Sequence, residues 1–462
     1  MSNAPMRRAV AERPPRTPLV AAACAAVVLV ASAFLPAMAA PAPATDGGTA
    51  RTTRLCPTTD AGAQVGVGSI GGGLTQALVA SPTQTTDVAA GGVLTIGKDP
   101  IRLSGPLGTA FWGVATASSA TGVDQGLSAA PCRQPRAEHW FTGVRSNANA
   151  QAELELVNLD STEAAVNVTI YGADGQVAAA GGRGVLVSGQ SQRTLGLGPM
   201  VDAAGPLTLQ VTTSSGRVAA YVRQRLFNGT APLGSDWIAP GASPSTTVVL
   251  PSVPAGAGAR TLVIGNPGDR TAQVKVEVLG TDGAYAPVGV EQVDVPAGST
   301  RTFGLDQALA GMGVALRLTS TRDIVGAVEA VTTGDVATLT GVTDLGASVS
   351  AVIGLPAGVT PVLTVANPSS GTAHVEVKVT DASGKELAAK TADVPAAASL
   401  VVEPGATTVA VVTITSSEPS VRAAVAASGN VGSVPGLTVV GLTDASSTVA
   451  TVSLTPDPRL GA

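Results

Sequence analysis

Three stretches of the chain share the same alternation of apolar and polar residues around an asparagine. The asparagines are Asn158, Asn266 and Asn367, which are 108 and 101 residues apart. Eight to twelve residues after each of them, every second residue is aliphatic: Val166, Val168 and Ile170, then Val274, Val276 and Val278, then Val375, Val377 and Val379. A period of two predicts strands with one face in a core and the other in water. The chain therefore contains a tandem repeat with one strand register.

Each repeat also has a glycine seventeen residues after its asparagine, at Gly175, Gly283 and Gly384. The preceding residue is Asp or Ser, and such dipeptides supply the positive φ that a tight hairpin needs. Six or seven short apolar runs per repeat, without helical periodicity, predict one immunoglobulin-like β-sandwich in each. We expect an all-β chain whose tandem sandwiches stack into an extended rod.

Proline, glycine and serine concentrate between the repeats and divide the chain. The predicted organisation is a signal peptide or uncleaved membrane anchor over 1–39, a Pro/Ala/Gly linker over 40–50, a small N-terminal β unit over 51–135, and β-sandwich repeats over 136–243, 244–346 and 347–462.

The N-terminus has the pattern of an export signal. Four arginines precede an uncharged run over 19–35, and Ala37-Met38-Ala39 follows as a small-x-small cleavage pattern. Seventeen residues are close to the shortest length that spans a bilayer, so cleavage and retention as an anchor are both open. Either outcome predicts an exported protein of the cell envelope or the medium. If residues 19–35 are not cleaved, they are its one expected contact with the membrane.

Cys56 and Cys132 are the two cysteines outside the predicted export segment. In an exported chain they can form a single intramolecular bridge, so we expect a disulfide. Closing a loop of about 77 residues stabilises a protein by about 4.5 kcal/mol in the chain-entropy model. The alternative, a pair of metal ligands, lacks further Cys or His at a suitable spacing.

Composition narrows the classes of function. Hydrophobic residues make up 45% of the chain but aromatic residues only 2%, which predicts cores of small aliphatic side chains. The net charge is -5, and we find no cluster of Lys and Arg along the sequence after the N-terminus. Nucleic-acid binding needs such a basic face, so we expect no nucleic-acid partner.

No motif in the chain carries recognisable catalytic chemistry. Residues 66–71 match GxGxxG, but the strand-turn-helix context of a dinucleotide site is missing, which favours a glycine-rich turn. His139 and His374 have neither an HExxH nor a GxSxG motif near them. We therefore predict no catalytic, cofactor-binding or metal-binding residue, and no cofactor. A deep pocket that held two or more of Asp124, Glu138, His139 and Asp160 would favour an enzyme instead.

The few aromatic residues include three at the edges of the repeats. Trp140 and Phe141 lie near the start of the first repeat, and Trp237 lies near its end. Aromatic side chains at domain edges are typical of contact surfaces. We interpret these three residues as a candidate interaction surface, either toward a partner or between domains.

The repeat pattern resembles a known family. The Asn-Pro turns at Asn266 and Asn367, and the Cys56/Cys132 unit ahead of Trp140, are similar to an uncharacterised family of large exported actinobacterial proteins, domain of unknown function 5719. The resemblance implies export and association with the envelope, and it implies no assigned activity.

These observations favour a non-catalytic, exported scaffold or interaction protein of the cell envelope. Its expected partners are other envelope proteins or wall polymers. One alternative is a membrane-anchored accessory protein of envelope polysaccharide or cell-wall assembly, and another is an enzyme. Fold class alone does not decide between them.

Overall fold

The computed structural model describes residues 51–443, except 58–62, 71–72, 90–91, 96, 108–109, 347, 382 and 406–408. The expected export segment and its cleavage pattern lie outside the described residues. Within the described part, no helix has both the length and the apolar character needed to cross a bilayer. Nearly all regular structure is β, as predicted, and α2 (Asp306–Leu309) is the one helix among the described elements.

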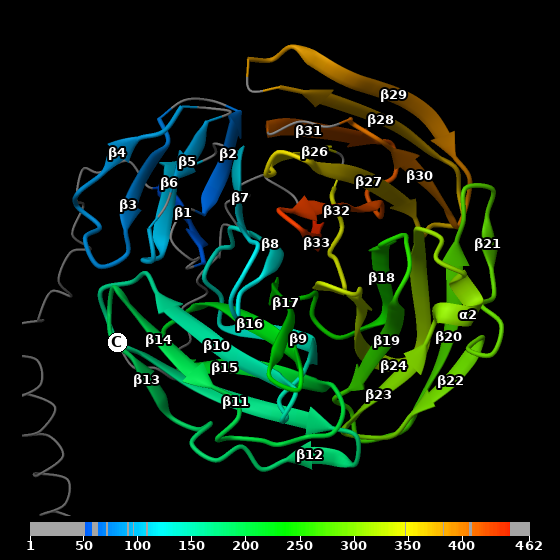
Figure 1. Cartoon of the computed structure of the whole chain (residues 1–462), viewed down its shortest axis with the longest axis horizontal. Coiled ribbons are helices and arrows are strands. Elements are labelled where there is room, and N and C mark those ends of the chain that lie inside the picture. Colours follow the sequence, from blue (N-terminus) through cyan, green and yellow to red (C-terminus); the bar gives the residue numbers. More distant parts are fainter. Residues whose placement is uncertain are drawn as a thin grey trace, which may run out of the picture. The chain divides into compact units, whose positions relative to one another are not determined.

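The strands form four modules, each with two layers of sheet (Figure 1). Module 1 contains β1 (Arg51–Cys56), β2 (Gln64–Ile70), β3 (Thr75–Leu78), β4 (Thr86–Asp87), β5 (Val93–Thr95), β6 (Ile101–Pro106), β7 (Ala110–Ser119) and β8 (Gly126–Pro131). Module 2 contains β9 (Glu138–Val144), β10 (Ala150–Asn158), β11 (Ala164–Gly172), β12 (Gly175–Val177), β13 (Val185–Val187), β14 (Ser191–Gly196), β15 (Leu207–Ser215), β16 (Ala219–Asn228) and β17 (Ala231–Ile238). Module 3 contains β18 (Ser245–Val253), β19 (Ala259–Asn266), β20 (Ala272–Leu279), β21 (Ala284–Tyr285), β22 (Gln292–Val295), β23 (Ser299–Gly304), β24 (Val314–Val331) and β25 (Val336–Thr340). Module 4 contains β26 (Ser348–Gly354), β27 (Val359–Asn367), β28 (Ala373–Thr380), β29 (Glu386–Val394), β30 (Ala398–Val402), β31 (Val409–Ser416), β32 (Arg422–Val431) and β33 (Val434–Gly441).

Modules 2, 3 and 4 repeat one strand order. One layer runs β14-β10-β16-β17 in module 2 and β30-β27-β32-β33 in module 4. Module 3 has the same order, β23-β19-β24-β25, but its long strand β24 also pairs with β18 and β20 of the other layer. The alternation that the sequence predicts is present, because the aliphatic residues of β11, β20 and β28 are buried in the cores.

The three repeat asparagines are completely buried and make equivalent hydrogen bonds. In module 3, Asn266 Nδ2 donates to the carbonyls of Arg270 at 2.8 Å and Val295 at 3.0 Å, and its Oδ1 accepts the Gly268 N–H at 3.0 Å. Asn158 and Asn367 bond the carbonyl four residues on and the N–H two residues on in the same way. Each asparagine therefore fixes the corner between two strands of different layers.

The predicted hairpin glycines have the expected backbone conformation. Gly175, Gly283 and Gly384 have φ values of 126°, 139° and 86°. A side chain would be strained at such angles, which explains glycine at this place in every repeat.

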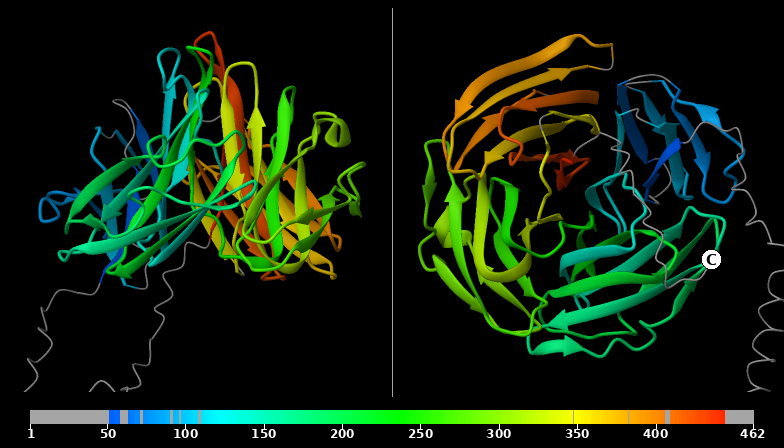
Figure 2. Two further views of the ribbon diagram at one scale, coloured as in Figure 1. Left: turned by 90° about the horizontal axis from the view of Figure 1, so that it is seen from below. Right: turned by 180° about the vertical axis from the view of Figure 1, so that it is seen from behind.

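The last strands of the four modules meet one another. They are β8, β17, β25 and β33, and each lies at the edge of its own sheet. Strand β8 contacts β17 and β33, and β25 contacts the same two strands, which closes a ring. Figures 1 and 2 show the modules following one another around these strands, with module 4 beside module 1. Four sheet edges that would otherwise be open are covered in this way.

The expectation of an extended rod is therefore wrong. Strands β2 and β7 of module 1 contact β26 of module 4, which end-to-end stacking does not allow. Hydrophobic clusters also cross between modules, since Leu127 of module 1 packs in the core of module 4 and Leu437 of module 4 packs in the core of module 3. The sequence periodicity reports which face of a strand is buried inside a module, but it carries no information on how modules pack together.

Candidate functional site

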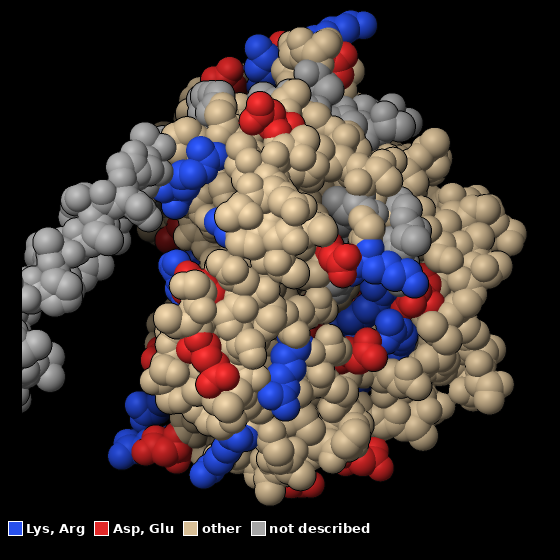
Figure 3. Space-filling view, turned by 90° about the vertical axis from the view of Figure 1, so that its left-hand side faces the viewer, with Lys and Arg blue, Asp and Glu red and all other residues tan. Residues whose placement is uncertain are grey.

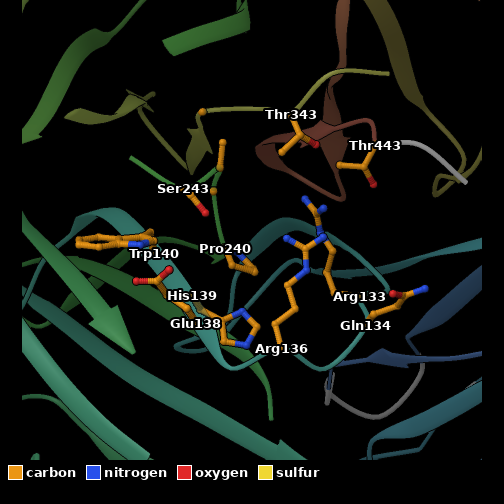
Figure 4. Close-up of a pocket in the computed structure, with 13 residues that line it drawn as sticks. Arg133, Gln134, Arg136, Glu138, His139, Trp140, Pro240, Ser243, Thr343 and Thr443 are labelled. Atoms are coloured by element: carbon orange, nitrogen blue, oxygen red, sulfur yellow. The ribbon is translucent and has the colours of Figure 1, made fainter. Parts of the chain in front are cut away.

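The linkers that join the modules converge around a small cavity. It is lined by Arg133, Gln134 and Arg136 after β8, 240–243 after β17, Gly341 and Thr343 after β25, and Thr443 after β33 (Figure 4). Its volume is about 30 Å³. A cavity needs about 10–15 Å³ on this measure to hold one water molecule, so this one admits a small group and not a sugar ring.

Backbone hydrogen bonds hold these linkers in place. Arg133 and Leu55 exchange two bonds, of 2.8 Å and 2.7 Å, and Arg136 exchanges two with Val218. Ala242 donates to the carbonyl of Gly341 at 2.8 Å, which ties the second linker to the third. The floor of the cavity is therefore built from paired backbone, and the side chains project from a fixed frame.

Two residues named as candidate catalytic groups line this cavity, but they do not form a pair. Glu138 and His139 are consecutive in strand β9, and consecutive strand residues point to opposite faces. Figure 4 shows their side chains diverging. Glu138 accepts a hydrogen bond from Gln210 at 2.8 Å, and His139 Nε2 lies 2.8 Å from the carbonyl oxygen of Val218.

Burial keeps His139 neutral. Desolvation lowers the pKa of this imidazole to about 4, and the nearby charges of Arg136 and Arg133 lower it further. A neutral ring donates its one N–H to the Val218 carbonyl, which is a structural role. Of the other two candidates, Asp124 pairs with Arg223 and Arg225, and Asp160 pairs with Arg217. The structure therefore brings together only Glu138 and His139 of the four, and it gives them different surroundings.

The strongest electrostatic feature of the cavity is a pair of arginines. Figure 4 shows the guanidinium groups of Arg133 and Arg136 close together and directed toward Thr343 and Thr443. No hydrogen bond or ion pair joins either guanidinium to another described residue, and Arg133 Nε is buried without a partner. Burial lowers the pKa of Arg133 to about 10, and the positive charges of Arg136 and Arg54 oppose its protonation as well.

A second buried polar site lies where the four modules meet. Asp335 Oδ2 accepts N–H groups from Leu127 of module 1 and Leu437 of module 4, both at 2.7 Å. Asp236 Oδ1 accepts the Ala129 N–H of module 1 at 3.1 Å and lies 3.2 Å from Thr438 Oγ1 of module 4. Burial raises the pKa of Asp335 to about 8, and burial together with the charge of Asp335 raises the pKa of Asp236.

Glycine permits the close approach to Asp335. A Cβ on Gly126 would lie 2.2 Å from Asp335 Oδ1, and one on Gly234 would lie 2.5 Å from Asp335 Cα. Both glycines also have positive φ, of 113° and 151°. Sequence reasoning missed this site, because no motif marks two aspartates and two glycines whose partners lie in other modules.

The candidate interaction surface is buried. Trp140, Phe141 and Trp237 are 4%, 0% and 3% exposed, so they offer no face to an external partner. Trp140 stacks on Tyr171 and packs against Val325 of module 3, while Trp237 packs with Tyr221, Leu55 and Ala130 between modules 1 and 2. Phe141 belongs to the core of module 2. The edges of these modules face other modules, which accounts for the burial.

The remaining sequence features have structural roles. Cys56 and Cys132 form the predicted disulfide, with an S–S distance of 2.01 Å, and join β1 to the residue after β8. The expected glycine-rich turn at 66–71 is wrong, because Gly66 and Gly68 lie in β2 and pair with β7. A Cβ on Gly68 would lie 2.4 Å from the Trp112 indole, so glycine there makes room for that ring.

No metal site is apparent in the described part of the chain. Among the described residues, no three His, Cys, Asp or Glu side chains converge on one point. His374 is exposed in module 4, where its Nδ1 lies 2.8 Å from Asp393 across the β28–β29 pair.

Comparison with known proteins gives a family but no activity. Among curated proteins, none matches the sequence. A search of solved structures gives the crystal structure of Streptomyces avermitilis alpha-L-rhamnosidase complexed with L-rhamnose, at 10% identity and a TM-score of 0.14. That match covers 84% of this chain, and this chain spans about half, 54%, of the rhamnosidase chain. A TM-score this low carries no argument about fold or chemistry. Residues 83–405, well over half of the chain, match a family described as a family of unknown function (DUF5719), and the protein belongs to that family.

Proposed function

We propose that this protein is an exported, non-catalytic interaction protein of the cell envelope. The observation that carries the proposal is the cavity where the linkers meet. It presents two arginines that form no ion pair with a described residue, together with Ser243, Thr343 and Thr443, while Glu138 and His139 point apart. Hydrogen-bond donors without an assembled acid, base and nucleophile are suited to binding rather than to bond cleavage.

The closed arrangement of modules supports a role in binding. Asp335 and Asp236 tie modules 1 and 4 to modules 3 and 2 through buried hydrogen bonds. Arg145 of module 2 adds a bidentate ion pair to Glu329 of module 3, at 2.8 Å and 2.5 Å. Residues from different modules therefore keep fixed positions around the cavity, as a preorganised binding site requires.

In-cell cross-linking of the full-length protein tests this function. We expect reproducible capture of envelope proteins or wall polymers from intact cells. Recovery of no consistent partner would contradict an interaction role. The N-terminus of the mature protein adds a second test. A chain beginning at Ala40 in the medium supports a secreted form, whereas intact residues 19–35 in the membrane fraction support the anchored accessory protein.

A further inference from the structure

A second, larger cavity lies beside the first. It has a volume of about 260 Å³ and is formed by Arg51, Thr52, Thr53 and Arg102 of module 1 and by residues 134–135, 159–160 and 217 on the side of module 2. Gln134 lines both cavities. The linker that carries Arg133, Gln134 and Arg136 therefore lies between the two cavities.

The three arginines of this second cavity differ in their hydrogen-bond and ion-pair partners. Arg51 is held by hydrogen bonds from its guanidinium to Ser104 O at 2.8 Å, Gly73 O at 2.9 Å and Thr75 Oγ1 at 3.1 Å. Arg217 forms a bidentate ion pair with Asp160, at 2.9 Å and 3.1 Å. Arg102 is half-buried, and no hydrogen bond or ion pair joins it to another described residue.

Arg102 therefore has no hydrogen-bonded or ion-paired partner among the described residues. Burial lowers its pKa, and the like charge of Arg51 lowers it further, whereas Asp160 raises it. A partly desolvated guanidinium loses water without gaining an acidic partner, which is unfavourable unless an anion binds.

Together the two cavities form a local excess of positive charge. Among the described residues, five arginines line them (Arg51, Arg102, Arg133, Arg136 and Arg217) against two acidic residues (Glu138 and Asp160). The whole chain has a net charge of -5, so this concentration goes against the overall balance. The sequence shows no cluster of basic residues here, because the fold gathers arginines that are dispersed between positions 51 and 217.

We propose that these adjoining cavities bind a polyanionic glycan, with Arg133 and Arg136 taking one carboxylate or phosphate group and Arg102 taking another. The inference rests on the proposed envelope function and names its ligand class. The planar guanidinium matches both kinds of anionic group through paired N–H···O bonds. A cavity of about 30 Å³ suits one small charged group, and one of about 260 Å³ has room for part of the chain that carries it.

The surroundings favour a glycan over a membrane or a nucleic acid. Figure 3 shows that basic and acidic side chains are interspersed on the face of modules 1 and 2 seen there, on a surface that is mostly uncharged. A lipid surface is attracted by a broad basic face, whereas Arg102 and Arg133 are partly buried in the cavity walls. Single-stranded nucleic acid needs aromatic platforms for its bases, and the aromatic rings that the described residues place on the cavity walls, Trp140 and His139, are buried.

Calorimetric binding to the full-length protein tests the site. The probes are polygalacturonate as a polycarboxylate, long-chain polyphosphate, neutral dextran, inorganic phosphate, a single-stranded DNA oligonucleotide and phosphatidylglycerol vesicles. We expect both acidic polymers to bind more tightly than inorganic phosphate, with an affinity that falls as salt is raised from 50 to 200 mM, and no binding of dextran. Arg102→Gln and Arg136→Gln should each weaken polymer binding about tenfold, because each removes charge-assisted hydrogen bonds.

Arg322→Gln is the matched control, since Arg322 is exposed in module 3 and lines neither cavity. Circular dichroism and thermal unfolding of every variant separate loss of binding from loss of folding. Unchanged polymer binding in folded Arg102→Gln and Arg136→Gln overturns the site, and so does an absence of polymer binding by the wild type. Tighter binding to vesicles or to DNA overturns the glycan assignment. If cross-linking captures envelope partners equally with wild type and arginine variants, the proposed function stands and this site fails.

Discussion

Replacing Asp335 with alanine tests whether buried hydrogen bonds close the ring of modules. The side chain accepts N–H groups from Leu127, Leu437 and Val336 at 2.7, 2.7 and 2.9 Å. Alanine leaves three buried donors without these acceptors, and an unsatisfied buried group costs about 1–3 kcal/mol. Removing a carboxyl group that is itself costly to bury offsets part of the loss. We expect the free energy of unfolding to fall by about 3 kcal/mol or more.

Urea unfolding followed by circular dichroism measures this change. Asp335→Asn is the matched variant, because its one side-chain oxygen can still accept the Leu127 and Leu437 amides while its NH2 group faces the Val336 N–H. It should cost less than alanine. An alanine variant within about 0.5 kcal/mol of the wild type, the range of ordinary surface substitutions, would refute the reasoning.

The same residue predicts a pH dependence. Burial raises the pKa of Asp335 to about 8 from its ordinary 3.8, so the folded protein retains a proton that the unfolded chain releases. The stabilisation is complete below about pH 4 and is lost as the pH rises through about 8. Its slope reaches about 1.4 kcal/mol per pH unit between these values. Unfolding at pH 5 and pH 8 should therefore differ more in the wild type than in Asp335→Asn, and equal differences would contradict the assigned pKa.

Three further substitutions test the repeat, the module core and an interface. Asn266→Ala should lower the free energy of unfolding by about 2–4 kcal/mol in urea, because it removes the four hydrogen bonds of a completely buried amide. Gly68→Ala places a Cβ 2.4 Å from the Trp112 indole, so it should destabilise module 1 and shift the tryptophan emission; an unchanged emission spectrum and thermal midpoint would count against it. Arg145→Ala leaves Glu329, 1% exposed, without its ion-pair partner and should cost about 3–5 kcal/mol, with partial recovery in the double variant that adds Glu329→Gln.

The sequence was informative wherever the relevant contacts lie within one module. The period of two at Val274, Val276 and Val278 placed these residues in a core, and the positive φ of Gly283 followed from its Asp-Gly turn. The disulfide followed from the count of cysteines. The burial of the valines and the turn at Gly283 depend on neighbours in the same strand or hairpin. The disulfide was predictable because two cysteines can pair in only one way.

Contacts between modules could not be predicted in this way. The bond between Leu127 and Asp335 joins residues 208 positions apart, and neither residue belongs to a pattern that indicates the other. Trp237 was expected at an edge, and the edge is covered by module 1. In the cavity, the short separation of Arg133 and Arg136 around a proline was a usable signal, but Arg102 comes from a distant strand of another module.

The closed ring of modules brings together the residues that line the two arginine-containing cavities. Arg102 and Arg217 belong to different modules, and Thr343 and Thr443 reach the neighbouring cavity from modules 3 and 4. In an extended rod these residues would be separated and each guanidinium would be solvated. Closure instead holds Arg133 and Arg102 partly desolvated and without an ion pair to any described residue, where a bound anion gains most. Substitutions at Asp335 that loosen the ring should therefore also weaken polyanion binding, although this carboxyl group lines neither cavity.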